Sequence, residues 1–246
     1  KFSTSREILE VIEEYELNLP YDSTTGIAFA EGYLWITAQF NTLYKYDLDS
    51  GQIIADYNIH SNPYSIAWDG EYLWIGTATS SMATTIHAYD TEGNLVGNFD
   101  GPHDHWPGIT WDGNYLWISE ADCFDDPTLY QVNINGTVIR SISSNLNGAT
   151  ATGLAWADNH EEGRLYTYGI GGGNQVNVDS DVAESIRYFT FDFGGDDRGS
   201  GLVHDGVDLW VLPWVNNMLY QIDDGIEEQL ISDWLSTSET SGTVSP

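Results

Sequence analysis

Basic residues are scarce in this chain. Its 246 residues include 7 Lys+Arg against 38 Asp+Glu, which gives a formal net charge of −31 at pH 7. A surface this acidic repels phosphate backbones and anionic lipid headgroups, so the sequence predicts no nucleic-acid partner and no membrane-surface partner. Apolar runs are short as well, and none approaches the roughly 18 to 20 residues that a membrane-spanning helix needs. We therefore expect no membrane insertion.

Cysteine is nearly absent. The one cysteine, Cys123, excludes an internal disulfide, and the carboxylates around it disfavour a reactive thiolate. This usage fits either the cytoplasm or a bacterial or archaeal exterior. The motifs of several enzyme classes are also missing, since the chain has no Gly-x-Ser-x-Gly, no His-Glu-x-x-His and no phosphate-binding loop.

Aromatic residues are plentiful, and they fall in a repeat. The chain has ten Trp and fifteen Tyr, many of them within five related segments that begin at Gly26, Ser65, Gly108, Gly153 and Gly201. Each segment has an apolar strand, a turn, and a second strand such as Leu34-Trp35-Ile36. We expect a third strand at residues 43–46, 86–89, 129–132, 187–190 and 219–222, and a fourth strand in the first three repeats.

A period near 40 to 45 residues with four short strands is typical of a β-propeller blade. The sequence therefore predicts an all-β, five-bladed propeller of four-stranded antiparallel blades. The fifth repeat ends after residue 224, and residues 8–19 could supply its outer strand, which would close the ring and remove an exposed edge. A helix over residues 6–16 is the less favoured alternative. The predicted domains are a propeller at 1–232 and a linker or the start of another module at 233–246.

The segment GITWDGNYLWISE at residues 108–120 resembles the blade motif of NHL-type and streptogramin-lyase-type propellers, with weaker copies from Gly26 and Ser65. This resemblance implies the fold, in a superfamily that includes lyases, lactonases, cyclotransferases and binding modules. The Gln-Gly-Leu and Glu-Ser-Thr patterns of plant-type glutaminyl cyclotransferases are absent. The tail DWLSTSETSGTVSP at 233–246 resembles the opening of immunoglobulin-like modules of bacterial and archaeal surface proteins, which implies a longer, extracellular, multi-domain chain.

Loops at one face of a propeller surround the central channel, and here they carry aromatic, amide and acidic side chains. Aromatic rings can stack on sugar rings while polar groups bind hydroxyls, so carbohydrate or another surface protein is the expected partner. The predicted ligand-binding residues are Tyr21, Phe40, Tyr64, Trp106 and Trp214.

Two metal hypotheses arise from the loops. Calcium is the expected ion, bound by oxygen ligands at Asp122, Asp125, Asp126, Asp179, Asp181 and Glu184. Zinc or another transition metal at His103, His105, Glu120 and Asp122 is the alternative. Solvated acidic loops would look the same in sequence. The acidity itself fits either a calcium-rich exterior or high salt, where screening removes self-repulsion.

The favoured function is an extracellular or cell-surface recognition or scaffold module that is stabilised by calcium. The alternative is a lyase or glycoside hydrolase at the channel mouth, whose catalytic residues would come from His103, His105, Glu120 and Asp22, with Asp196 or Asp197 as a further acid. A purely structural spacer is the third possibility.

Overall fold

The computed structural model describes residues 7–20, 23–60, 62–79, 83–121, 128–146, 151–170, 172–191, 199–214 and 217–225. These residues form strands, turns and loops, and no helix among them is long or apolar enough to span a membrane. Several predicted positions lie outside them: Tyr21, Asp22, Asp122, Asp125, Asp126, Asp196, Asp197 and the tail at 233–246.

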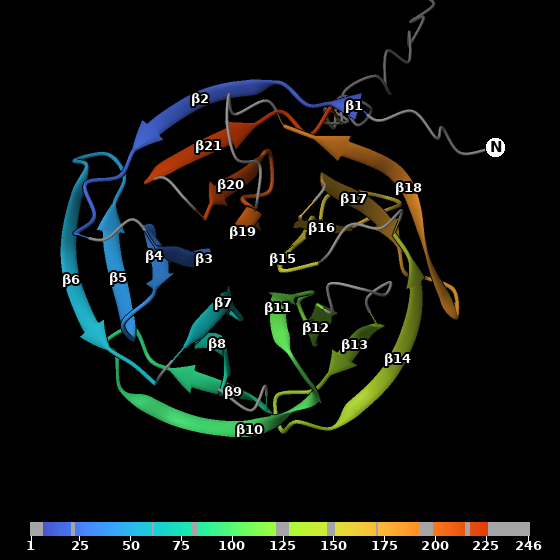
Figure 1. Ribbon diagram of the computed structural model, residues 1–246, viewed down its shortest axis with the longest axis horizontal. Helices are drawn as coiled ribbons and strands as arrows, with labels where there is room; N and C mark the ends of the chain where they lie inside the picture. The colour runs from blue at the N-terminus through green and yellow to red at the C-terminus, as the bar shows by residue number, and fades with distance from the viewer. Residues whose placement is uncertain are drawn as a thin grey trace, which may run out of the picture.

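The strands form antiparallel groups of four, arranged around a common axis (Figure 1). The first group is β3 (Thr24–Ala30), β4 (Tyr33–Ala38), β5 (Thr42–Asp47) and β6 (Gln52–Asn58). The second is β7 (Pro63–Trp68), β8 (Leu73–Ala78), β9 (Ala83–Tyr89) and β10 (Leu95–Asp104). The third is β11 (Trp106–Trp111), β12 (Leu116–Ala121), β13 (Thr128–Val132) and β14 (Val138–Asn145).

Two more groups follow in the chain. The fourth is β15 (Gly153–Trp156), β16 (Leu165–Gly169), β17 (Gly172–Asn177) and β18 (Val182–Thr190). The fifth is β19 (Gly199–His204), β20 (Leu209–Pro213), β21 (Met218–Ile222) and β2 (Val11–Glu16). The third and fourth groups are joined into one sheet because β14 and β18 pair in parallel, and β1 (Glu7–Ile8) also pairs in parallel with β18. The fold is thus all-β and propeller-like.

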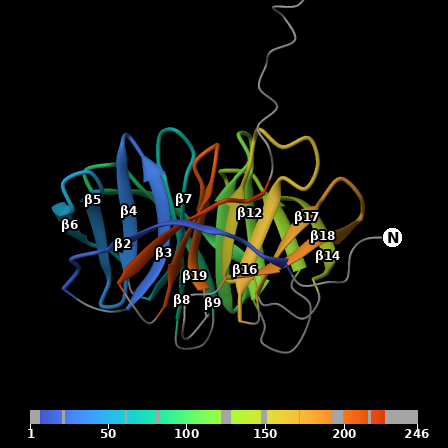
Figure 2. The same ribbon diagram turned by 90° about the horizontal axis from the view of Figure 1, so that it is seen from above.

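The N-terminal segment forms the fourth strand of the last group, as the sequence predicts. Strand β2 pairs antiparallel with β21, from Val11 opposite Ile222 to Glu16 opposite Met218. It runs transverse to inner strands such as β3 on the outside of the molecule (Figure 2). The strand assignment is therefore confirmed over the helical alternative, and β21 has a partner on each side.

The third strand of the fourth repeat was predicted wrongly. Residues 187–190 belong to the fourth strand, β18, whereas the third strand is β17, which starts at the glycines 172 and 173. Glycine usually weakens a strand, and its presence at the start of β17 is explained by the ring of Phe189, which packs closely against the backbone there. A Cβ on Gly173 would come within 2.3 Å of Phe189 Cε2, so Phe189 packs where a side chain would otherwise stand.

The repeated tryptophan and aspartate hold the turns of the inner hairpins. Asp112 Oδ1 accepts hydrogen bonds from the backbone N–H groups of Asn114 and Tyr115, and its Oδ2 accepts one from Trp117 Nε1 at 2.8 Å. Asp69 bonds Trp74, and Asp205 bonds Trp210, in the same way. These indoles are nearly fully buried, so each aspartate satisfies a donor that would otherwise lack a partner in the core.

The ends of the inner strands define two faces. The entry face is the end at which β3, β7, β11, β15 and β19 begin, together with residues 39–41, 59–60, 62, 104–105 and 213–214. The turn face is the opposite end, where hairpins join β3 to β4, β7 to β8, β11 to β12, β15 to β16 and β19 to β20.

Candidate functional site

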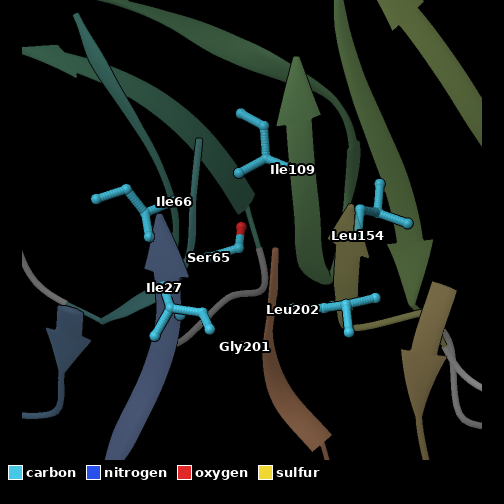
Figure 3. Close-up of a pocket in the computed structure, with 9 residues that line it drawn as sticks. Ile27, Ser65, Ile66, Ile109, Leu154, Gly201 and Leu202 are labelled. Atoms are coloured by element: carbon cyan, nitrogen blue, oxygen red, sulfur yellow. The ribbon is translucent and has the colours of Figure 1, made fainter. Parts of the chain in front are cut away.

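The axis between the inner strands is filled by small and aliphatic side chains. A space of about 150 Å³, part of it open to solvent, is lined by Gly26, Ile27, Ser65, Ile66, Ile109, Gly153, Leu154, Gly201 and Leu202 (Figure 3). Its aliphatic side chains are all at most 3% exposed. No room for a water-sized molecule is left inside this space, whereas ligand pockets usually have about 300 to 1,000 Å³. The axis is therefore too narrow and too apolar for a sugar or a peptide, and a site has to lie on a face.

Glycine at the start of the inner strands explains this close approach. A Cβ on Gly26 would lie 2.8 Å from Ser65 Cα, and a Cβ on Gly201 would lie 3.0 Å from the backbone N of Ile27. Because backbone atoms cannot move aside as a flexible side chain can, larger residues here would push neighbouring strands apart.

Backbone strain gathers at the entry face. The described residues include five non-glycine positions with positive φ, and four of them lie there: Phe40, Asn41, Asn62 and His105. His105, at φ 90°, directly precedes β11, and its backbone carbonyl accepts a hydrogen bond from Thr84 Oγ1 at 2.6 Å. Such conformations need support from their surroundings and are common at ligand sites.

Four of the five predicted ligand-binding aromatics are described, and all four belong to this face. The rings of Tyr64 and Trp106 stack with centroids 6.1 Å apart and an interplanar angle of 29°. Phe40 is 71% exposed and Trp214 is 41% exposed. The structure thus joins Tyr64 to Trp106 and places Phe40 and Trp214 at the surface of the same face.

A cluster of polar side chains on the entry face connects β10, β12 and β13 through His103, Glu120 and Tyr130. Tyr130 donates to Glu120 Oε2 at 3.5 Å, and the His103 ring stacks on Tyr130 with centroids 5.4 Å apart. Burial, and then the charge of Glu120, raise the pKa of Tyr130, so the hydroxyl keeps its proton at neutral pH. His103 directs Nε2 at the carbonyl oxygen of Ser119, at 3.0 Å, and Nδ1 at the carbonyl oxygen of Asp104.

Glu120 stands out by its place in the repeat. The corresponding second-strand positions of the other repeats hold Ala38, Thr77, Gly169 and Pro213, none of which carries charge. Glu120 pairs in β12 opposite Pro107, and the next pair toward the entry face is Trp106–Ala121. Since side chains of successive strand residues point to opposite faces of the sheet, Glu120 shares its sheet face with Pro107. Aligning the repeats position by position would have singled it out from sequence alone.

One repeat earlier, two histidines occupy the positions that correspond to the His103–Tyr130 pair. His60 corresponds to His103 and His87 to Tyr130, and the two imidazoles stack 4.5 Å apart at 18°. Tyr89 Oη accepts from the His60 backbone N–H at 3.0 Å and lies 2.9 Å from its Nδ1. Burial, and then the neighbouring His60, lower the pKa of His87 to about 4. His87 is therefore neutral at neutral pH.

The predicted calcium ligands are only partly described. Asp179 and Asp181 lie exposed in the turn between β17 and β18, and Glu184 lies exposed near the start of β18. Glu184 pairs with Asn145 at the end of β14. Among the described residues, no three of these carboxylates converge, so calcium binding stays a prediction.

The turn face holds a buried polar cluster that the sequence reasoning missed. His160 Nε2 and His204 Nε2 lie 2.9 and 3.2 Å from the same oxygen, Asp224 Oδ2, and Tyr166 donates to that oxygen at 3.1 Å. Arg187 donates to Tyr166 Oη at 3.4 Å and to the carbonyl oxygen of Asp224. The signal was again a departure from the repeat: Tyr166 replaces the tryptophan, and His204 replaces the aromatic residue that ends the inner strand.

This cluster has the composition of a metal site, and its ligand atoms lie within 4.8 Å of one another, so it could hold an ion. The hydrogen bonds, however, indicate a metal-free network in which His204 Nε2 carries a proton. The backbone N–H of Gly206 donates to His204 Nδ1 at 3.0 Å, so the proton of this ring is on Nε2 and points at Asp224. A histidine that binds a metal through Nε2 normally donates from Nδ1. The cation of Arg187 beside Tyr166 also disfavours a second positive charge.

Comparisons with solved structures bear on the fold. The fold is similar to that of a glutaminyl cyclase. The match to the crystal structure of Myxococcus xanthus glutaminyl cyclase has a TM-score of 0.68 at 14% identity and covers 88% of this chain and 96% of that chain. No protein-family model matches the chain, and no curated protein matches its sequence.

Two further structures are similar at lower scores. A chain of the mitotic checkpoint complex matches with a TM-score of 0.52 at 11% identity, covering 91% of this chain and 94% of that one. Kuenenia stuttgartiensis hydrazine synthase matches with a TM-score of 0.51 at 14% identity, covering 80% of this chain and 57% of that one. At such identities these two similarities support the propeller-like fold alone.

Proposed function

We propose that the chain is a five-bladed β-propeller, closed by β2, and that it is an enzyme with its active site on the entry face. Three features support the closed ring: the five groups of four strands, the contacts of each inner strand with the next, including β19 with β3, and the pairing of β2 with β21. From the sequence alone, an enzyme was the alternative to a recognition module. The similarity to glutaminyl cyclase favours this alternative.

Glu120 is the observation that carries the enzyme proposal. It is a partly buried carboxylate at a position where the other repeats have uncharged residues, and Tyr130 supports it from the next strand. A carboxylate held in this way can accept a proton and return it during one reaction. The Tyr64–Trp106 stack, which belongs to the same entry face, offers an apolar surface for a substrate.

The proposed reaction is cyclisation of an amino-terminal glutamine. The α-amine attacks the side-chain amide carbon, a carbon–nitrogen bond forms, and Glu120 accepts the proton that the amine loses. Glu120 then donates this proton to the departing amide nitrogen, which leaves as ammonia. One proton-transfer group suffices here, whereas a glycosidase needs two carboxyl groups at a defined separation.

Ammonia release from peptides that begin with glutamine tests this proposal. Glu120→Gln should lower kcat by about 10²- to 10⁴-fold because the proton-transfer group is lost. Glu71→Gln is the matched control, since Glu71 also accepts a tyrosine hydroxyl, from Tyr72 at 2.6 Å, but lies on the turn face. The absence of ammonia release, or equal loss in both variants, would refute the proposed site.

The second candidate is the recognition module, which the Tyr64–Trp106 stack and the exposed Phe40 and Trp214 favour. It predicts binding of carbohydrate or a surface protein without turnover, and weaker binding after Trp106→Ala. This second proposal also includes an extracellular or cell-surface location and a place within a longer, multi-domain chain. A glycan array with the wild type and Trp106→Ala separates it from the enzyme.

A further inference from the structure

The chain has few cationic side chains, and the structure shows what four of the seven contact. Seven Lys+Arg face 38 Asp+Glu, and four of the seven, Lys45, Arg140, Arg164 and Arg187, are described. Lys45 Nζ lies over the rings of Tyr33 and Trp35, at 4.3 and 5.2 Å from their centroids. None of these four belongs to the loops of the entry face, and the other three, Lys1, Arg6 and Arg198, lie outside the described residues.

The three described arginines donate to backbone carbonyl oxygens outside the loops of the entry face. Arg140 Nη2 donates to the carbonyl oxygen of Val178 at 2.7 Å, and Arg164 Nε donates to that of His160 at 2.6 Å. Arg187 belongs to the turn-face cluster. In the described part of the entry face, an anionic group of a substrate therefore finds no lysine or arginine.

The same face offers groups that attract cations. Asp104 is exposed at the end of β10, beside His103, and Glu120 follows on β12. The rings of Phe40 and Trp214 are exposed, and aromatic faces bind ammonium and guanidinium groups. Charge and aromatic exposure are independent observations, and both favour a positively charged ligand.

We infer that the entry face takes cationic polypeptides, chains in which lysine or arginine follows the reacting amino terminus. This inference rests on the proposed function for the reaction and adds the substrate class. The field of a protein with net charge −31 raises the local concentration of such a chain, and the aromatic rings hold its cations. A free amino acid would be a poor substrate, because its α-carboxylate is repelled.

Kinetics with three peptides of equal length tests the inference: Gln-Ala-Arg-Ala-Arg-Ala, its Arg→Gln counterpart and its Arg→Glu counterpart. At about 0.02 M ionic strength the arginine peptide should have a kcat/KM at least about tenfold above that of the glutamate peptide. At about 0.5 M salt this ratio should fall to about two, since screening weakens the attraction. Equal values at low salt, or a preference for the glutamate peptide, would overturn the inference while leaving cyclisation intact.

Variants locate the effect on the entry face. Phe40→Ala and Asp104→Asn should each lower kcat/KM for the arginine peptide by about threefold or more, and should lower it less for the neutral peptide. Glu71→Gln removes the same charge from the turn face and should have no effect. If Glu71→Gln and Asp104→Asn act equally, the effect belongs to net charge alone and the site is wrong.

Acetylated peptides separate this inference from the proposed reaction. They lack the nucleophilic amine, so their binding, measured by fluorescence anisotropy, does not depend on turnover. If no peptide is cyclised, the proposed function fails, yet the acetylated arginine peptide should still bind more tightly to the wild type than to Phe40→Ala. Equal binding to these two proteins would refute the cationic ligand class.

Discussion

At the scale of single residues, His87 occupies a position that tyrosine holds in three other repeats, at Tyr44, Tyr130 and Tyr220. It is 7% exposed and stacks on His60, so a charge on this ring is unfavourable. Proton uptake at His87 therefore works against the folded state.

The first prediction concerns acid stability. The pKa of His87 is lowered from 6.5 to about 4 in the folded protein, so the unfolded chain binds the proton first as the pH falls. The free energy of unfolding should fall between about pH 6.5 and pH 4, by up to about 3 kcal/mol, and this term should be constant above that range. Urea unfolding across this range measures it.

His87→Tyr restores the residue of the other repeats and removes this titration. Carboxylates also titrate in acid, so the difference between the profiles of wild type and variant isolates the contribution of His87. Parallel profiles would show that the His60–His87 stack does not control acid stability.

The second prediction concerns Asp224, which is 1% exposed. Asp224→Ala leaves three buried donors, on His160, His204 and Tyr166, without their shared acceptor. We expect a loss of about 3 kcal/mol in the free energy of unfolding. The exposed Asp49→Ala is the control and should change stability by less than about 0.5 kcal/mol. A small effect of Asp224→Ala would mean that the cluster is not the hydrogen-bond network described above.

At the scale of elements, β2 is the strand whose contribution can be isolated. It supplies the outer partner of β21, and Tyr15 packs on Trp210 with ring centroids 5.6 Å apart. Leu17 and Leu19, which follow β2, belong to the same buried cluster as β3 and β4 residues such as Ile27 and Leu34. The segment therefore stabilises two groups of strands at once.

The third prediction is that a chain without residues 1–19 exposes the edge of β21 and associates with itself. Unpaired strand edges template aggregation. Size-exclusion chromatography should show oligomers, and a synthetic peptide of residues 7–19, added in excess, should restore the monomer. A scrambled peptide is the control. A stable, monomeric truncated protein would mean that β2 is dispensable.

At the scale of the whole molecule, the net charge dominates. The fourth prediction is that added salt raises the melting temperature, because screening reduces the repulsion among 38 acidic residues. The measurement is thermal unfolding in EDTA, then with NaCl, then with Ca²⁺ at equal ionic strength. A site saturated a hundredfold over its Kd would add about 2.7 kcal/mol.

The two outcomes distinguish the origins of the acidity. A rise specific to Ca²⁺ would support the predicted ligands at Asp179, Asp181 and Glu184. A rise that NaCl reproduces would assign the acidity to salt adaptation and remove calcium from the account.

Periodicity alone determined a large part of this protein. The strand pattern, the turns at Asp-Gly and the buried Leu-Trp-Ile strands follow from the alternation of apolar residues, because each repeat folds locally in the same way. The sequence predicted that residues 8–19 pair with the fifth repeat because an unpaired strand edge needs a partner, and residues 11–16 of this segment do so. Ile8 pairs instead with Thr190 of β18. The fourth repeat was the exception, since packing of Phe189 over Gly173 is not visible in sequence.

Only the tertiary structure decided which polar residues meet. His160, His204 and Asp224 are up to 64 residues apart, and no local pattern links them, yet the fold brings their ligand atoms within 4.8 Å. Likewise, Glu120 and His103 were named from sequence, but their common neighbour Tyr130 emerged from the pairing of β12 with β13. A repeat determines the secondary structure because it acts locally, whereas a site depends on contacts between repeats.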